Sequence, residues 1–186
     1  MSINEDASSP TVAKVFGIIH IVYASIMVLF TVYSLVMMFT GPVMPEGTPG
    51  AEEIIGIQKE LMGTPKVQVF MITSIVISLA LIAVLFVAGL KLLKKQLPGR
   101  TLSLFYAWAG VVSTILSTVL YHLIVHRTYE ELLLSSSLEQ QMVDGMMMVA
   151  KFQPLFMLCC GAVYPVILLI FMMPEKFARS LTGPAE

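Results

Sequence analysis

The sequence predicts an all-α integral membrane protein: a bundle of four antiparallel transmembrane helices with two short helices on its outer face. Three observations support this fold class. Of the 186 residues, 57% are hydrophobic and only 12% are charged, roughly half the charged fraction of a soluble domain. The apolar residues gather in four runs, each long enough to cross a bilayer. A short basic turn separates the second run from the third.

The first apolar run covers residues 12–39. A polar segment with Glu5 and Asp6 precedes it and lacks the basic start of a secretory signal, and the run is longer than the apolar part of such a signal. We therefore expect an uncleaved first transmembrane helix. At 1.5 Å per residue it is about 40 Å long, so it has to tilt or protrude from the bilayer. Gly41 and Pro42 end it.

Residues 41–66 form the first outer loop. Its prolines and glycines keep the first part irregular, and residues 51–62 then predict a short helix. Glu52 and Glu53 lie in the first turn of this helix, where the helix dipole favours acids. Apolar residues fall on one side of it at helical spacing: Ile54, Ile57 and Leu61. We expect this helix to lie on the membrane surface or against the bundle.

The second and third spans are predicted at residues 67–93 and 101–125, joined by a cytoplasmic turn at 94–100. Pro98-Gly99 is a strong turn signal, because proline presets φ and glycine accepts positive φ. Tyr106 and Trp108 near the start of the third span are typical of an interfacial aromatic belt.

The second outer loop covers residues 127–151, and the helical pattern of the third span continues into it as far as Leu134. Ser136 and Glu139 have the spacing of a capping box, which predicts a second short helix from residue 138 to about 151. The fourth span is predicted at residues 155–173, before Pro174.

The distribution of Lys and Arg sets the expected orientation. With the basic turn placed in the cytoplasm, seven Lys and Arg lie inside and four outside, whereas acids number four inside and eight outside. The positive-inside rule then places both termini in the cytoplasm. The net charge of −1 gives no indication of nucleic-acid binding.

Small residues recur at helical spacing in the apolar runs. Membrane helices pack through such residues, because they let two backbones approach closely. We therefore expect helix-packing roles for Gly17, Ala24, Gly110, Ser113, Ser117 and Gly161. Pro165 lies midway along the fourth span, where the missing N–H predicts a kink.

Two ring-bearing residues inside the spans, His20 and Tyr164, are candidates for a ligand or proton site. An ionisable group buried in a membrane is a functional candidate by default. The alternative for His20 is a neutral imidazole hydrogen-bonded to a hydroxyl or carbonyl of a neighbouring helix. We favour that alternative, since no second ionisable group lies at the same depth.

The outer end of the third span carries His122, His126 and Glu130, spaced four residues apart. On a continuous helix these side chains stack on one face, where two imidazoles and a carboxylate suit Zn²⁺ or another divalent ion. The alternative is an ordinary interfacial cluster, because the glutamate embedded in the zinc-protease motif is missing.

The opening of the first span, Lys14-Val15-Phe16-Gly17-Ile18-Ile19-His20-Ile21-Val22-Tyr23, resembles that of small uncharacterised bacterial inner-membrane proteins with four predicted spans. In that group a K-x-x-G-I-x-x-I pattern begins the first helix. The resemblance implies a location in the bacterial inner membrane and no defined activity.

The sequence carries no phosphate-binding loop, nucleophile elbow or zinc-protease helix, and no Asp, Glu, Lys or Arg lies well inside an apolar run. We therefore expect a protein that is not an enzyme, binds no cofactor and acts through contacts. Its expected partners are the lipid bilayer and either a second copy or another membrane protein, with no nucleic acid. The alternative is a small-molecule or ion binder or transporter with a cavity between the helices.

Overall fold

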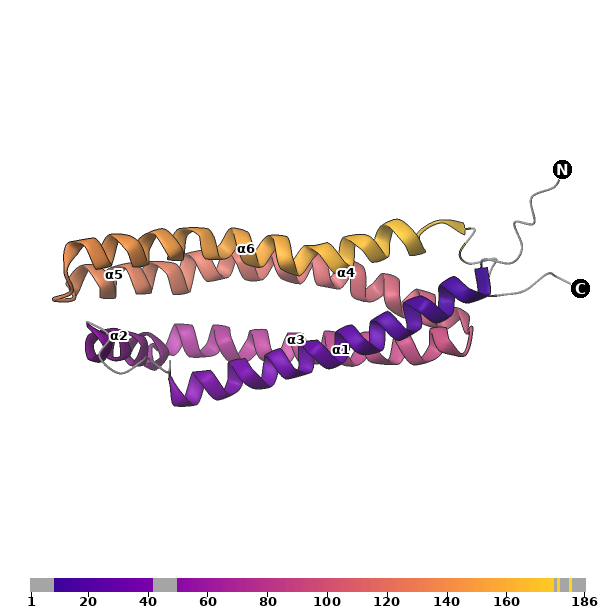
Figure 1. The fold of residues 1–186 in the computed structure, drawn as a ribbon, viewed down its shortest axis with the longest axis horizontal. Coiled ribbons are helices and arrows are strands. Elements are labelled where there is room, and N and C mark those ends of the chain that lie inside the picture. Colours follow the sequence, from indigo (N-terminus) through magenta and orange to yellow (C-terminus); the bar gives the residue numbers. More distant parts are fainter. Residues whose placement is uncertain (1–8, 42–49, 176, 178–180, 182–186) are drawn as a thin grey trace, which may run out of the picture. The chain divides into compact units, whose positions relative to one another are not determined.

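A computed structural model describes residues 9–41, 50–175, 177 and 181, and within this part of the chain every regular element is helical. Four segments are long and apolar enough to cross a membrane: Val12–Thr40, Pro65–Leu93, Leu97–Ser135 and Gln140–Met172. The predicted fold class is thereby confirmed. In Figure 1 the helices are α1 (Ser9–Thr40), α2 (Ala51–Gly63), α3 (Pro65–Leu93), α4 (Leu97–Leu120), the π-helix η2 (Tyr121–His126), α5 (Arg127–Ser135) and α6 (Gln140–Met172).

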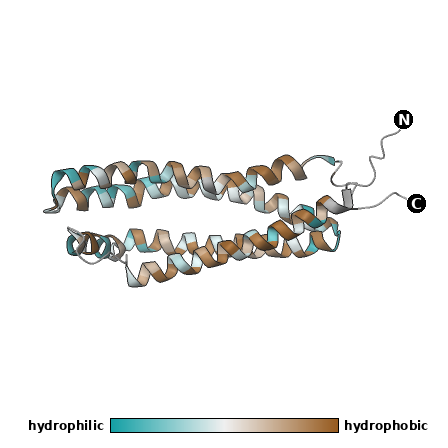
Figure 2. Ribbon diagram, in the orientation of Figure 1, coloured by the Kyte–Doolittle hydropathy of each residue, from teal (hydrophilic) through white to brown (hydrophobic). Residues whose placement is uncertain are grey.

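The chain divides into two compact units. The first unit contains residues 1–30, 78–113 and 161–186, and the second contains residues 31–77 and 114–160. Each long apolar segment contributes one part to each unit. Hydrophobic residues predominate along all four segments (Figure 2), as expected of helices whose outer surface meets lipid.

The core of the first unit is built from the start of α1, the end of α3, the start of α4 and the end of α6. Phe16 of α1 contacts Phe171 of α6, whereas Tyr23, further along α1, stacks on the earlier Tyr164. The chain numbering therefore runs in opposite directions in these two helices, which makes them antiparallel. Four large side chains of the core are completely buried: Leu85, Leu92, Leu168 and Met172.

The turn between α3 and α4 differs from the predicted one. α3 ends at Leu93, and Lys95 takes a left-handed φ of 52°. The N–H of Gln96 bonds to the carbonyl of Lys91 and that of Lys95 to the carbonyl of Leu92, both at 2.9 Å. This is the Schellman pattern of helix termination, in which the left-handed residue is usually glycine.

Pro98 and Gly99, predicted as the turn itself, instead lie in the first turn of α4. That position tolerates proline, because the N–H that proline lacks would have no partner inside the helix anyway. Gly99 is buried, and a Cβ at this position would lie 2.7 Å from the backbone nitrogen of Leu92. Gly99 is therefore needed for the close packing of α4 on α3. The left-handed residue of the turn is not this glycine but Lys95.

In the second unit the predicted short helix is confirmed as α2, which follows Gly50 with a φ of 69°. Its buried residues, Ile57 and Leu61, belong to two apolar clusters that α5 and its neighbours complete. Glu53 of α2 also accepts two hydrogen bonds from Ser137, at 2.5 Å from the backbone N–H and 2.8 Å from the hydroxyl. α2 is therefore fixed to the connection between α5 and α6 by apolar and polar contacts together.

The second predicted short helix and the fourth predicted span form one helix, α6. The capping box is wrong: the hydroxyl of Ser136 donates to the carbonyl of Leu133 at 2.6 Å, and α6 begins only at Gln140. Because α6 begins at Gln140, Ser136 lies too early in the chain to occupy the N-cap position, from which a side chain caps a helix. The backbone carbonyl of Glu139 accepts from Met142 and Val143 in the first turn of α6. Among the described residues, α2 is the short helix that lies outside the four long apolar segments, whereas α5 continues the segment Leu97–Ser135.

Candidate functional site

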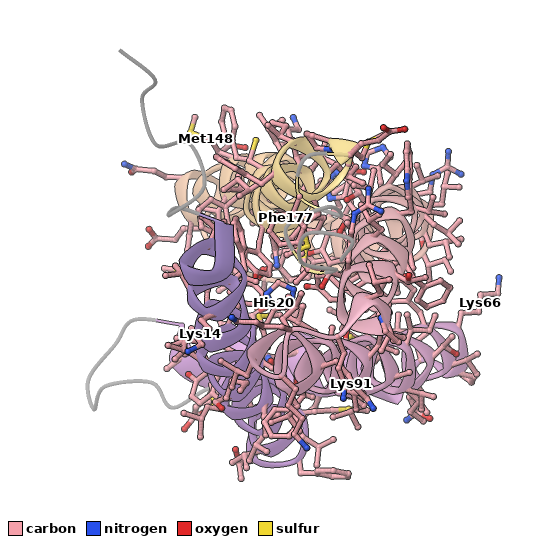
Figure 3. The ribbon with its side chains drawn as sticks, turned by 90° about the vertical axis from the view of Figure 1, so that its right-hand side faces the viewer. Lys14, His20, Lys66, Lys91, Met148 and Phe177 are labelled. Carbon is pink, nitrogen blue, oxygen red and sulfur yellow. The ribbon has the colours of Figure 1, made fainter. Side chains whose placement is uncertain are left out.

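A polar centre of three residues lies inside the first unit: His20 of α1, Ser103 of α4 and Tyr164 of α6. His20 and Ser103 are completely buried, and Tyr164 is 8% exposed. Nε2 of His20 lies 2.9 Å from Oγ of Ser103, and Nδ1 lies 2.9 Å from the hydroxyl of Tyr164. One imidazole thus connects three helices, and in Figure 3 it lies between helices.

The polar centre extends beyond these three side chains. Oγ of Ser103 donates to the carbonyl oxygen of Gly99 at 2.8 Å. The imidazole of His20 has a further hydrogen bond to the backbone of Phe16, one turn earlier on α1. A continuous set of hydrogen bonds thus runs from Tyr164 through His20 to Ser103 and Gly99 and joins α6, α1 and α4.

This geometry supports a structural role for His20, the alternative favoured from the sequence. Both ring nitrogens are satisfied by neighbouring helices. Each such bond contributes about 0.5–1.5 kcal/mol net, whereas a buried partner left unpaired costs about 1–3 kcal/mol. No sequence signal pointed to Ser103, because a serine near the start of an apolar run has many possible partners.

Aromatic rings surround the polar centre. Tyr23 stacks on Tyr164 with ring centroids 4.1 Å apart, and its hydroxyl is hydrogen-bonded to Tyr106. Tyr106 is only 7% exposed, so its predicted place in an interfacial belt is wrong. It lies three residues after Ser103 on α4 and therefore on the same buried face. Trp108 is 55% exposed and lies on the outward face.

Glycines allow two helix pairs of the first unit to touch. A Cβ on Gly17 would lie 3.0 Å from the carbonyl oxygen of Gly89, and one on Gly89 would lie 2.9 Å from that of Gly17. A Cβ on Gly110 would lie 3.0 Å from the ring of Pro165. The packing role predicted for Gly17 and Gly110 agrees with these contacts, and Gly89 is the partner that the sequence did not reveal.

The other predicted packing residues differ in burial. Ala24 is 1% exposed and belongs to the core of the first unit. Ser113, Ser117 and Gly161 are only partly buried. Pro165 is completely buried in α6, and its predicted kink stays a prediction.

Arg100 caps the C-terminal end of α6. Its Nε donates to the carbonyl of Met172 at 2.8 Å, and its Nη2 donates to that of Met173 at 2.9 Å. The last carbonyls of a helix have no partner within the helix, and a cation there also interacts favourably with the helix dipole. Arg100, expected only as a positive charge of the turn, thus joins α4 to α6.

A histidine pair, His122 and His126, lies on η2 in the second unit. The ring centroids are 4.9 Å apart and the ring planes are inclined by 32°. His122 is exposed, whereas His126 is 6% exposed. Nδ1 of His126 is buried without a hydrogen-bond partner among the described residues. Such an unpaired group costs about 1–3 kcal/mol, and π-helical turns often occur at functional sites.

Glu130 does not join the histidine pair as the sequence predicted. Among the described residues there is no group of three His, Cys, Asp or Glu side chains that could hold a metal ion. The prediction assumed one uniform helix through all three positions. The π-helical turn of η2 interrupts that regularity, and Glu130 lies beyond it in α5.

The fold and these sites define the protein as an all-α membrane protein with several spans. Comparison with models of known protein families, with curated proteins and with solved structures finds no match. Function therefore has to be inferred from this chain's own residues.

Proposed function

We propose that this chain is a non-enzymatic membrane protein that acts through contacts, either with a second copy or as an accessory subunit of a larger complex. The observation that supports this most is a difference within α1. In the first unit this helix buries Ala13, Gly17, His20 and Ala24 against its neighbours. Between residues 31 and 40 none of its side chains is buried.

The composition of this unburied part of α1 favours a protein partner in addition to lipid. Tyr33 is 60% exposed and Phe39 is 78% exposed, and methionines at 37 and 38 lie between them. Aromatic residues and methionine are enriched in protein interfaces. The exposed Ser34 is a small residue of the kind through which membrane helices associate. We define residues 31–40 as the contact segment.

The polar centre supports the same proposal in a different way. Its ring nitrogens and hydroxyls are used within the chain, so the first unit holds itself together by them. A first unit held together by its own hydrogen bonds, with the contact segment left unburied, is an arrangement suited to docking. An ion-binding role would depend on a different pair of residues, His122 and His126.

The proposed location is the inner membrane with both termini in the cytoplasm. The turn after α3 carries Lys94 and Lys95, both exposed, and Lys91 lies in the last turn of α3. Positive residues in such a short turn are retained on the cytoplasmic side. An impermeant thiol reagent tests this on intact cells, with Lys94→Cys in a background where Cys159 and Cys160 are alanine. Lys94→Cys should react only after the cells are opened.

Crosslinking tests the contact segment. In the same cysteine-free background, Val36→Cys places a thiol at a position that is 49% exposed. Ile18→Cys, at a position 54% exposed in the first unit, is the matched control. We expect Val36→Cys in native membranes to give a crosslinked dimer or a defined larger adduct, and Ile18→Cys to give neither.

Light scattering and native mass spectrometry of the protein in mild detergent provide the second measurement. The expected result is a defined assembly larger than one chain. A strictly monomeric particle, together with no adduct at position 36 in native membranes, would overturn the proposed function.

A further inference from the structure

The histidine pair has the features of a metal-binding site that is open on one side. His122 and His126 are neighbours on η2, with ring centroids 4.9 Å apart. The ring nitrogens lie at the edges of the rings, so modest side-chain rotations bring one nitrogen of each ring near a common point. Zinc–imidazole bonds are about 2.0–2.1 Å long. Two imidazoles one helical turn apart can therefore share a single ion.

A second observation comes from His126 alone. This side chain is more than nine-tenths buried, and its Nδ1 has no partner among the described residues. In the tautomer that carries its proton on Nε2, Nδ1 has a lone pair that no described residue uses, and such a lone pair is what a metal ion binds. A metal ion on Nδ1 would also remove the cost of leaving this nitrogen unpaired.

We propose that His122 and His126 bind one divalent transition-metal ion, such as Zn²⁺ or Cu²⁺, with water in the remaining coordination positions. Imidazole nitrogen suits these ions, whereas Mg²⁺ and Ca²⁺ prefer oxygen ligands. No third His, Cys, Asp or Glu of the described residues completes the site. Water therefore fills the open positions, and the exposed His122 gives access to them.

The charge around the pair also favours a cation. The described residues of the second unit carry seven carboxylates and four Lys or Arg side chains. A net negative field raises the local concentration of cations. Arg127 directly follows His126, but it is exposed and solvent screens its charge. This inference is independent of the contact function, because it involves neither residues 31–40 nor the polar centre.

The test uses the full-length protein in mild detergent, with any polyhistidine tag removed. Zn²⁺ is titrated by calorimetry, and Cu²⁺ is added for electron paramagnetic resonance. We expect one Zn²⁺ per chain and a Cu²⁺ spectrum with hyperfine coupling to two nitrogens. His122→Gln should weaken Zn²⁺ binding by at least about tenfold and reduce the coupling to one nitrogen, because one of two ligands is lost.

Two further variants make the test specific. Glu130→Gln should change the Zn²⁺ affinity less than about twofold, since this carboxylate is not grouped with the pair. His126→Gln should behave as His122→Gln does; if it fails to fold, the exposed His122 decides the question. Unchanged Zn²⁺ affinity in His122→Gln, or a Cu²⁺ spectrum without nitrogen coupling, would overturn the proposal. A loss in Glu130→Gln equal to that in His122→Gln would contradict a two-histidine site.

Discussion

The hydroxyl of Tyr164 lies 2.9 Å from Nδ1 of His20, across 144 positions of the sequence. Because the other ring nitrogen of His20 is bonded to Ser103, these two contacts together fix the orientation of the imidazole. It joins the last long helix to the first and explains how a histidine is tolerated inside an apolar bundle. The first two predictions test this bond.

Tyr164→Phe should destabilise the protein by about 1–3 kcal/mol, because the buried imidazole of His20 then loses its hydrogen-bond partner on α6. The ring, and with it the stacking on Tyr23, is retained. Unfolding in detergent, followed by circular dichroism, measures the change. Trp108→Phe is the control, since Trp108 is 55% exposed and lies outside the contact segment, and it should leave stability within about 0.5 kcal/mol. Equal losses in the two variants would contradict the proposed role of Tyr164.

Ser103→Ala and Tyr164→Phe should not be additive. Each removes one partner of the same imidazole, and the second loss acts on a ring whose position is already less restrained. We expect the double variant to differ from the sum of the single variants by about 0.5–3 kcal/mol. The measurement is a double-mutant cycle from the same unfolding experiments. Strict additivity would mean that the two hydrogen bonds of His20 act independently of one another.

The sequence was sufficient for the four spans, the helix at α2 and the packing role of Gly17, because each depends on local composition or spacing. The sequence was insufficient to show which residues of different helices contact one another. His20 stood out as a buried histidine, yet its bonds to Ser103 and Tyr164 depend on which helices meet. Gly89 had no feature that distinguished it from other residues of an apolar helix, because its role depends on the contact with α1.

Local signals were misleading where two interpretations share the same residues. Pro98-Gly99 satisfies both a turn and the first turn of a helix, and tertiary packing of Gly99 on Leu92 decides between them. Ser136 has capping-box spacing, but α6 begins only at Gln140, so Ser136 is not at the N-cap position. The predicted grouping of His122, His126 and Glu130 assumed a regular helix, and no feature of the sequence indicated the π-helical turn η2.

Gly89→Ala should destabilise the first unit. The added Cβ would lie 2.9 Å from the carbonyl oxygen of Gly17 and 2.9 Å from Cβ of His20, so α1 and α3 have to separate. Overpacking of this kind costs about 1–3 kcal/mol. Gly145→Ala is the control, because a Cβ there meets no atom within 4 Å. It should be neutral or stabilising by up to about 1 kcal/mol, as alanine favours helix. A neutral Gly89→Ala would show that the two helices do not touch at these glycines.

Lys95→Gly should stabilise the protein. Lys95 is the one non-glycine residue of the described chain with a positive φ, at 52°, and it occupies the position of the Schellman pattern that glycine favours. Relief of the left-handed strain is worth about 1 kcal/mol. Lys94→Gly removes the same charge from the neighbouring position, where φ is not positive, and should be destabilising. Thermal unfolding of both variants in one detergent measures the difference. If the two glycine variants shift the melting temperature equally and in the same direction, charge rather than backbone geometry would control the stability of this turn.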